Sequence, residues 1–174
     1  MWNWLTALLA VSSPVNVETV AGPPHLCEGN CVITEAGLTL VKDFEGYHPC
    51  PYKDPIGLWT VGFGHLMGPD ESRSKCYIGA DADNLLRSDL AIAEKGVNRR
   101  VIIALLPYQF SAVVSWTFNL GEGALRKSTM LKRINAHRHV DVPSEMLRWN
   151  RAGGKVLRGL TRRRKAEGAM YRGE

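Results

Sequence analysis

The sequence predicts an α+β fold that is mostly helical, in which a long helix joins a small β-hairpin lobe to a larger helical lobe. After residue 33, apolar residues recur every three or four positions through most of the chain, as they do in amphipathic helices. Only residues 58–63 are rich in side chains that favour strands. A length of 174 residues, with 45% hydrophobic and 22% charged side chains, is enough for one domain with a substantial core.

The first predicted helix follows Thr34, whose side chain can cap its N-terminus. Gly46 is expected to end this helix, because glycine readily adopts the backbone conformations found just beyond a helix. Glu45 therefore lies in the last turn. The apolar face consists of Leu38, Leu40, Val41 and Phe44.

The following segment cannot continue the helix, because three prolines and two glycines lie between residues 46 and 57. Residues 58–63, with the sequence LWTVGF, favour extended structure. Asp54 is therefore expected in a turn or hairpin. The region around Trp59 is the only part of the chain that indicates a sheet.

The rest of the chain is predicted to be helical. A helix capped by Asp81 is long enough to bridge two lobes, and its apolar stripe consists of Leu85, Leu86, Ile92 and Val97. Pro107 can open the next helix, since proline is tolerated in a first turn, and Gly121 can end it. Three further helices are expected to begin at Ser128, at Pro143 and near Leu160.

Two carboxylates lie where the helical and hairpin segments meet. Glu45 precedes Asp54 by nine residues, and Thr60 follows six residues after Asp54. Hydrolysis of a glycosidic bond needs one carboxyl group that is protonated and a second that is ionised on the opposite face of the sugar. A helix end near apolar residues and an open polar turn offer those two environments. The spacing therefore indicates a two-carboxylate hydrolytic site.

Each of these residues also has a purely structural interpretation. Glu45 alone would be a solvated residue at a helix end, and Asp54 before a proline would be a turn residue. Thr60 would be a β-branched residue in a strand. His65 titrates near neutral pH and is a candidate general base. Longer motifs are needed to decide between these interpretations.

Three ordered segments carry a specific resemblance. The first combines Glu45, Asp54 and Thr60 with the run WTVGFGH at residues 59–65. The second joins FNLGEGAL at 118–125 to STML at 128–131, and the third joins WNRAGGKVLRGL at 149–160 to RRR at 162–164. From about residue 33 to residue 172, the chain resembles the phage-type lysozymes, the endolysins of glycoside hydrolase family 24.

The resemblance implies a lysozyme-like cleft between the lobes and hydrolysis of the β-1,4 bond between N-acetylmuramic acid and N-acetylglucosamine in bacterial peptidoglycan, for host cell lysis. It implies that Glu45 is the general acid and that Asp54, ionised, positions or activates the water together with Thr60, with inversion at the anomeric carbon. His65 is expected to be structural, pairing with a carboxylate and tying the hairpin to a helix. Residues expected to line the sugar cleft are Leu66, Phe118 and Ser128. No cofactor is implied, because acid–base chemistry suffices.

Two other activities fit parts of this pattern. A lytic transglycosylase would cut the same bond with the acid alone and form a 1,6-anhydro sugar, and the presence of Asp54 and Thr60 argues against it. A basic protein that disrupts membrane or wall without hydrolysis is an alternative of another class. Its activity would survive replacement of Glu45 by glutamine.

Positive charge is concentrated at the C-terminal end. The formal net charge is +5, and residues 148–174 contain nine Lys or Arg against two Glu. Such a run usually forms a solvated helix face, and it would also attract the protein to the anionic cell wall. Nucleic acid is not expected as a partner, because the run lacks interleaved aromatic residues. One arginine of this run is a candidate partner of Glu45, and the sequence does not single it out.

The four cysteines, Cys27, Cys31, Cys50 and Cys76, lie in the first half of the chain. A metal site is not expected, because no second cysteine or histidine pair completes the Cys27-x-x-x-Cys31 spacing. Disulfides fit an enzyme that acts in the oxidising cell envelope. Of the three possible pairings, Cys27–Cys31 with Cys50–Cys76 is the one predicted. Since some exported endolysins of the family are activated by disulfide exchange, redox activation is a hypothesis here.

Residues 1–32 are expected to form a separate leader or extra segment, and residues 33–174 the catalytic domain. The apolar run at residues 2–11 is too short to span a bilayer, which needs about 20 residues. Three interpretations remain open: a weak secretory or signal-arrest-release segment that contacts membrane, an extra helix packed on the domain, and a disordered leader. The expected location is the host periplasm and cell wall, reached through this segment or through a holin. The protein is expected to act on glycan strands as a monomer.

Overall fold

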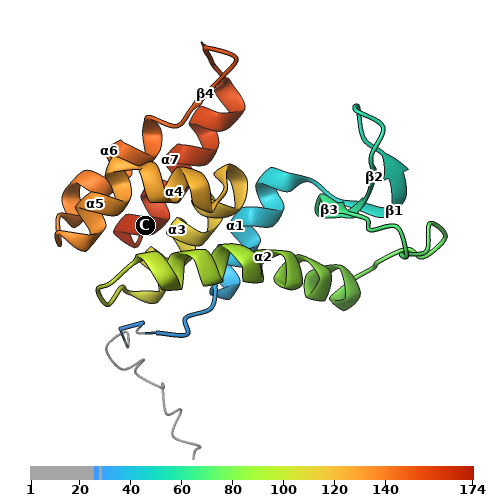
Figure 1. Cartoon of the computed structure of the whole chain (residues 1–174), viewed down its shortest axis with the longest axis horizontal. Coiled ribbons are helices and arrows are strands. Elements are labelled where there is room, and N and C mark those ends of the chain that lie inside the picture. The colour runs from blue at the N-terminus through green and yellow to red at the C-terminus, as the bar shows by residue number, and fades with distance from the viewer. Residues whose placement is uncertain (1–25, 28) are drawn as a thin grey trace, which may run out of the picture.

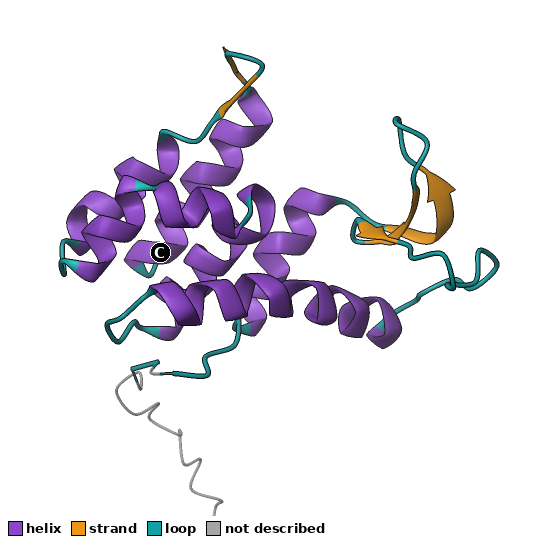
Figure 2. Ribbon diagram, in the orientation of Figure 1, coloured by secondary structure: helices purple, strands orange, loops and turns teal. Residues whose placement is uncertain are grey.

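The computed structural model describes residues 26–27 and 29–174, and it confirms the predicted fold class. Figure 1 shows a body of helices beside a small sheet, with one long helix reaching from the body toward the sheet. Helices make up most of the ribbon in Figure 2. In chain order the elements are α1 (Glu35–Glu45), β1 (His48–Lys53), β2 (Trp59–Gly62), β3 (His65–Leu66), α2 (Ala80–Arg100), α3 (Pro107–Leu120), α4 (Glu122–Lys127), α5 (Thr129–Asn135), η1 (His139–Asp141), α6 (Val142–Leu147), β4 (Arg151–Ala152), β5 (Lys155–Val156) and α7 (Arg158–Arg172).

Helix α1 begins and ends where the sequence predicts. The Thr34 side chain accepts a hydrogen bond from the backbone N–H of Gly37 at 3.1 Å, and Gly46 follows the last residue with φ +75°. The cap satisfies one of the backbone donors that a helix leaves free at its N-terminus. Leu38 and Val41 are buried against the body. Glu45 is therefore the last helical residue, directed to the point where the chain leaves the body for the sheet.

The small sheet has three antiparallel strands in the order β1-β2-β3. Thr60 of β2 pairs with Tyr52 of β1 on one side and with Leu66 of β3 on the other. Strand β1 lies outside residues 58–63, to which the predicted sheet was confined, and it contains prolines at 49 and 51. They are tolerated because β1 is an edge strand whose pairing is irregular between His48 and Tyr52, so no central ladder bond is lost.

Helix α2, at 21 residues, connects the sheet to the helical body. At the usual rise it is about 31 Å long. Its N-cap is Gly79 rather than Asp81, which corrects the predicted start. Asp81 lies in the first turn, where a negative charge interacts favourably with the helix dipole. The apolar positions Leu86, Leu90 and Val97 are buried on its inner face.

Helix α3 forms the centre of the core. Pro107 and Gly121 bound it as predicted, and every residue from Phe110 to Thr117 is buried. It packs against α1, α2 and α7. Each large apolar side chain buried in this way stabilises the fold by about 1.5–3 kcal/mol. The core thus holds α1 and α7, which carry two charged residues of the site described below.

Three short parts of the helical body were not predicted: the hairpin of β4 and β5, helix α4 and helix η1. Strands β4 and β5 form a short hairpin whose two turn residues, Gly153 and Gly154, both have positive φ. A Gly-Gly pair between two short extended segments is a recognised hairpin signal, so this hairpin could have been predicted from the sequence. Helix α4 was also missed, and α6 begins one residue before Pro143.

The cysteines form two disulfides in the predicted pairing, Cys27–Cys31 and Cys50–Cys76. The second joins β1 to the loop that precedes α2. The N-terminal predictions for residues 1–25 lie outside the described residues. Within the part of the chain that is described, no helix combines the length and apolar character needed to cross a membrane.

Candidate active site

Glu45 lies at the junction of the helical body and the sheet. Its side chain is 22% exposed, and its Oε1 accepts a hydrogen bond from Nη1 of Arg163 at 2.6 Å. On the sheet side it faces the turn between β2 and β3, where a Cβ atom placed on Gly64 would lie 3.9 Å from Glu45 Oε2. The end of α1 therefore brings the carboxyl group against both α7 and the hairpin. Arg163 is the arginine partner that the sequence did not single out.

Arg163 belongs to a buried charged network rather than to a solvated face. Arg163 and Arg164 are 4% and 0% exposed, and Glu167, one turn further along α7, is 0% exposed. Oε1 of Glu167 accepts hydrogen bonds from Arg163 Nε at 3.2 Å and from Arg164 Nη2 at 3.1 Å. The structure thus corrects the interpretation of the whole arginine run as solvent-facing. Two of its cations have carboxylate partners inside the protein, and Glu167 is a site-supporting residue that the sequence analysis missed.

Asp54 lies in the turn between β1 and β2. Its Oδ1 accepts hydrogen bonds from the backbone N–H groups of Ile56 at 3.0 Å and Leu58 at 2.8 Å. This arrangement is an Asx turn, which closes the tip of the hairpin. The other carboxylate oxygen, Oδ2, is not used in that turn. The structural interpretation of Asp54 therefore holds and leaves one oxygen for a second role.

Thr60 lies in the central strand of the sheet, where it is 4% exposed. Its hydroxyl group donates a weak hydrogen bond to the backbone oxygen of Leu58 at 3.4 Å. Leu58 also donates its N–H to Asp54, so the two polar side chains are held by the same residue. The strand and its turn thus place the second carboxylate and the threonine on one short rigid segment.

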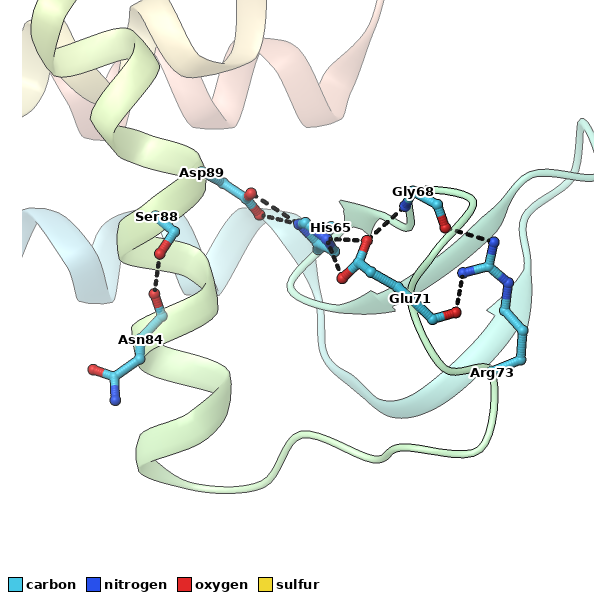
Figure 3. A network of polar contacts seen from close by, with 7 residues as sticks. All are labelled: His65, Gly68, Glu71, Arg73, Asn84, Ser88 and Asp89. Carbon is cyan, nitrogen blue, oxygen red and sulfur yellow. Dashed lines mark hydrogen bonds and ion pairs between the residues drawn. The ribbon is translucent and has the colours of Figure 1, made fainter.

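His65 connects the sheet to α2, as Figure 3 shows. Its Nδ1 lies 2.8 Å from Asp89 Oδ1, and its Nε2 lies 3.2 Å from both carboxylate oxygens of Glu71. The side chain of Glu71 also accepts a hydrogen bond from the N–H of Gly68. With both ring nitrogens engaged, the imidazole is not free to act as a base on substrate.

The electrostatics of this contact favour a charged imidazole. Burial opposes the charge, but hydrogen bonds to Asp89 and Glu71 raise the pKa of His65 above its usual value. Burial raises the pKa of the Asp89 carboxyl against the opposing effect of His65. The pKa of Glu71 is lowered, chiefly by the hydrogen bond from Gly68. His65 therefore forms a bridge between two carboxyl groups from different segments.

The three residues expected in the sugar cleft have different environments. Leu66 is 59% exposed on β3, and Phe118 is partly buried in the last turn of α3. Ser128 is 1% exposed, and its hydroxyl group caps α5 by accepting from Leu131 N–H and donates to the Leu125 carbonyl. Ser128 is thus a buried helix cap in this structure, and its expected place in the lining of the sugar cleft stays a prediction.

A pocket of about 230 Å³ lies beside Phe118, between α2 and the α3–α4 corner. Its other lining residues are Asp89, Ile92, Ala93, Thr117, Gly121 and Glu122. Its lining thus includes an aromatic residue and Asp89, the residue that pairs with His65. A larger hollow of about 610 Å³, between α6 and α7, contains none of the predicted site residues. Within the described residues, no group of three or more His, Cys, Asp or Glu side chains is arranged to hold a metal ion.

Comparisons with known proteins bear on the family and the fold of the chain. The family model of phage lysozyme matches residues 42–167. An endolysin of Bacillus phage PZA is 37% identical over 141 residues, or 80% of this chain and 54% of the relative. A SAR-endolysin of Escherichia phage Mu is 39% identical over 121 residues, or 70% of each protein. The solved muramidase domain of SpmX from Asticaccaulis excentricus has a TM-score of 0.72 at 34% identity and covers 81% of this chain and 97% of that domain. The chain spans about half the length of the Bacillus phage relatives it matches.

Proposed function

Because the chain belongs to the phage lysozyme family, we propose that it is a muramidase that hydrolyses the β-1,4 bond between N-acetylmuramic acid and N-acetylglucosamine in peptidoglycan. Glu45 is the general acid that protonates the leaving oxygen. Asp54 is ionised and, with Thr60, positions or activates the attacking water on the other face of the sugar. The sugar is held between the lobes, with Leu66 on the sheet side and Phe118 on the helical side.

The observation that carries this proposal is the position of Glu45 between α7 and the hairpin. One carboxyl group projects from the helical body and faces the Gly64 turn between β2 and β3, while the second lies in the turn between β1 and β2 of the same sheet. The two groups have different partners. Both are half-buried, but Glu45 accepts a hydrogen bond from the guanidinium group of Arg163, whereas Asp54 accepts from backbone N–H groups of its own turn.

The supporting residues divide into two sets. His65 and Asp89 hold the sheet against α2, and Arg163 holds Glu45 from α7. Neither set needs to touch the substrate. They are suited to keeping the two lobes at a fixed separation, since a small misplacement of reacting groups is costly in rate.

The proposed setting is the bacterial envelope. Relatives named endolysin and SAR-endolysin support a role in lysis of a host cell from the periplasmic side. Residues 33–174 form the catalytic domain in this proposal, and residues 1–32 contribute to export or release. Disulfides such as Cys50–Cys76 are compatible with that oxidising compartment.

The test is replacement of Glu45 by glutamine. The variant should keep its circular dichroism spectrum and lose at least about 100-fold in turnover, which is typical for removal of a general acid. Glu35→Gln is a matched control, because Glu35 is 82% exposed at the other end of α1. Mass spectrometry of the wild-type products should show hydrated reducing ends; 1,6-anhydro products would instead indicate a transglycosylase. Wall clearing by a folded Glu45→Gln variant would refute the catalytic assignment.

A further inference from the structure

The contact between Glu45 and Arg163 poses a problem for a general acid. The acid has to carry a proton, yet a guanidinium group 2.6 Å away favours the ionised carboxylate. Arg163 is itself 4% exposed, so water screens its charge only weakly. A second group has to take part of the charge of Arg163 if Glu45 is to remain a useful acid near neutral pH.

Glu167 has the geometry for this role. It lies four residues after Arg163 on α7, and its Oε1 accepts from Arg163 Nε at 3.2 Å. The same oxygen accepts the hydroxyl hydrogen bond of Ser115 at 2.9 Å, which fixes the carboxylate against α3. Arg163 Nη2 in turn donates to the backbone oxygen of Ser115 at 3.4 Å. The guanidinium group is therefore held from α3 and α7 while its Nη1 reaches Glu45.

We propose that Glu167 is a positioning residue for Glu45: acting through Arg163, it fixes the guanidinium group and neutralises part of its charge, so that Glu45 can keep a proton. This rests on the general-acid role proposed above for Glu45. Glu167 does not touch the substrate, and its influence on Glu45 passes through the shared arginine.

The ionised state of Glu167 follows from its contacts. Burial raises the pKa of its carboxyl group, whereas Arg164 and Arg163, both in contact, favour the ionised form. If Glu167 were neutral, two buried guanidinium groups would have only Glu45 as a carboxylate partner. Such an excess of buried positive charge is costly. The ionised carboxylate leaves the network of two arginines and two glutamates balanced.

The other charged groups near Glu45 do not take over this role. From α7, Arg164 is directed to Glu167 and to the Asn119 side chain, which accepts from it at 2.9 Å. Arg162 lies 5.3 Å from the ring centre of Phe44 and adds positive rather than negative charge. On α1 itself, Lys42 is paired with Asp83. Among the described residues, the carboxylates in contact with Arg163 are those of Glu45 and Glu167.

The experiment compares the pH dependence of kcat/KM for the wild type and the Glu167→Gln variant on peptidoglycan. Loss of the negative charge should let Arg163 act fully on Glu45, so the alkaline limb should move to lower pH by about one unit. Glu167→Asp keeps the negative charge, so its alkaline limb should lie close to that of the wild type. Glu174→Gln is the matched control, because Glu174 forms an exposed pair with Arg172 and should leave the limb unchanged. A role limited to folding would lower the amount of active enzyme without moving the limb.

A folded Glu167→Gln variant whose pH profile superimposes on that of the wild type would overturn the proposal. If the single variant does not fold, the double variant Glu167→Gln/Arg164→Gln removes one buried charge of each sign and carries the test, with the same direction of shift expected. An unshifted limb in that protein would also overturn it. The proposed function is tested separately, by the activity of Glu45→Gln and by the products of the wild type.

Discussion

Nδ1 of His65 lies 2.8 Å from Oδ1 of Asp89, and this contact joins strand β3 to helix α2 across the junction of the two lobes. Figure 3 shows the histidine between Asp89 and Glu71, with its two ring nitrogens facing opposite carboxyl groups. The sheet and the helical body are therefore connected by a titratable bridge as well as by the chain.

The first prediction concerns the pH dependence of stability. The pKa of His65 is raised in the folded protein, because the hydrogen bonds to Asp89 and Glu71 outweigh burial. A raised pKa means that the bridge contributes fully below the unfolded value of about 6.5 and is lost as pH rises through the folded value. The difference in Tm between wild type and His65→Gln should therefore be largest near pH 5 and shrink toward pH 9.

The control for this experiment is His48→Gln, because His48 is an exposed residue of the same sheet. Its Tm difference from the wild type should not follow the same trend. A difference between wild type and His65→Gln that stays constant from pH 5 to pH 9 would contradict the charged bridge.

The second prediction separates the two roles of Asp54. Asparagine at this position keeps an oxygen that accepts from Ile56 and Leu58, so Asp54→Asn should leave Tm almost unchanged. It removes the negative charge, so turnover should fall by at least about 100-fold. Alanine removes both, and Asp54→Ala should in addition destabilise the fold by about 1–2 kcal/mol. Denaturant unfolding and peptidoglycan hydrolysis measured on the same preparations check both effects. Substantial activity of Asp54→Asn would show that Asp54 has a structural role in its turn and no catalytic role.

Local signals explain why much of this fold is predictable from the sequence. Thr34, Gly46, Pro107 and Gly121 act within one helical turn, so their effects depend little on the rest of the chain. Strand β1 was missed because its prolines are acceptable only at a sheet edge, and being at an edge is a property of the assembled sheet.

The residues of the candidate site also divide into those that local sequence predicts and those that depend on how the chain packs. Glu45, Asp54 and Thr60 fall within one short segment whose pattern resembles a known family. The pairing of Glu45 with Arg163 spans 118 positions, and several arginines were equally good candidates. Whether an arginine is buried depends on a partner such as Glu167, and this is decided only when α7 packs on α3. Ser128 shows the reverse case: it caps α5 as its local sequence predicts, and the resulting burial removes it from the surface.

The third prediction tests the turn that faces Glu45. Gly64 has φ +88°, a conformation that costs a residue with a side chain about 1–2 kcal/mol. Gly64→Ala should therefore lower stability by that amount. It should also reduce turnover, because the strained turn relaxes next to Glu45 Oε2, which the added methyl group would contact at 3.9 Å. Gly154→Ala is the matched control. Gly154 has φ +76° with open space around it, in the hairpin of β4 and β5, so the same strain should leave turnover per folded molecule unchanged. Equal losses of turnover in the two variants would show that Gly64 has no special role.

The last prediction concerns the Cys50–Cys76 disulfide. It links positions 26 residues apart, so its loss should destabilise the fold by about 3–4 kcal/mol, whereas loss of Cys27–Cys31, with a separation of 4, should cost less. Cys50 lies in β1 between Glu45 and Asp54 in sequence, and the loop it binds is also held by the hydrogen bond from Tyr77 N–H to the Pro49 oxygen at 2.7 Å. That bond should keep the Cys50→Ser/Cys76→Ser variant folded at low temperature with reduced activity.

The measurement is lytic activity and Tm with and without a thiol reductant, for the wild type and for each cysteine pair replaced by serine. Reductant should lower the activity of the wild type and of Cys27→Ser/Cys31→Ser alike, since both contain the bond in β1. Activity of the wild type that reductant does not change would show that this disulfide does not control the hairpin that carries Asp54.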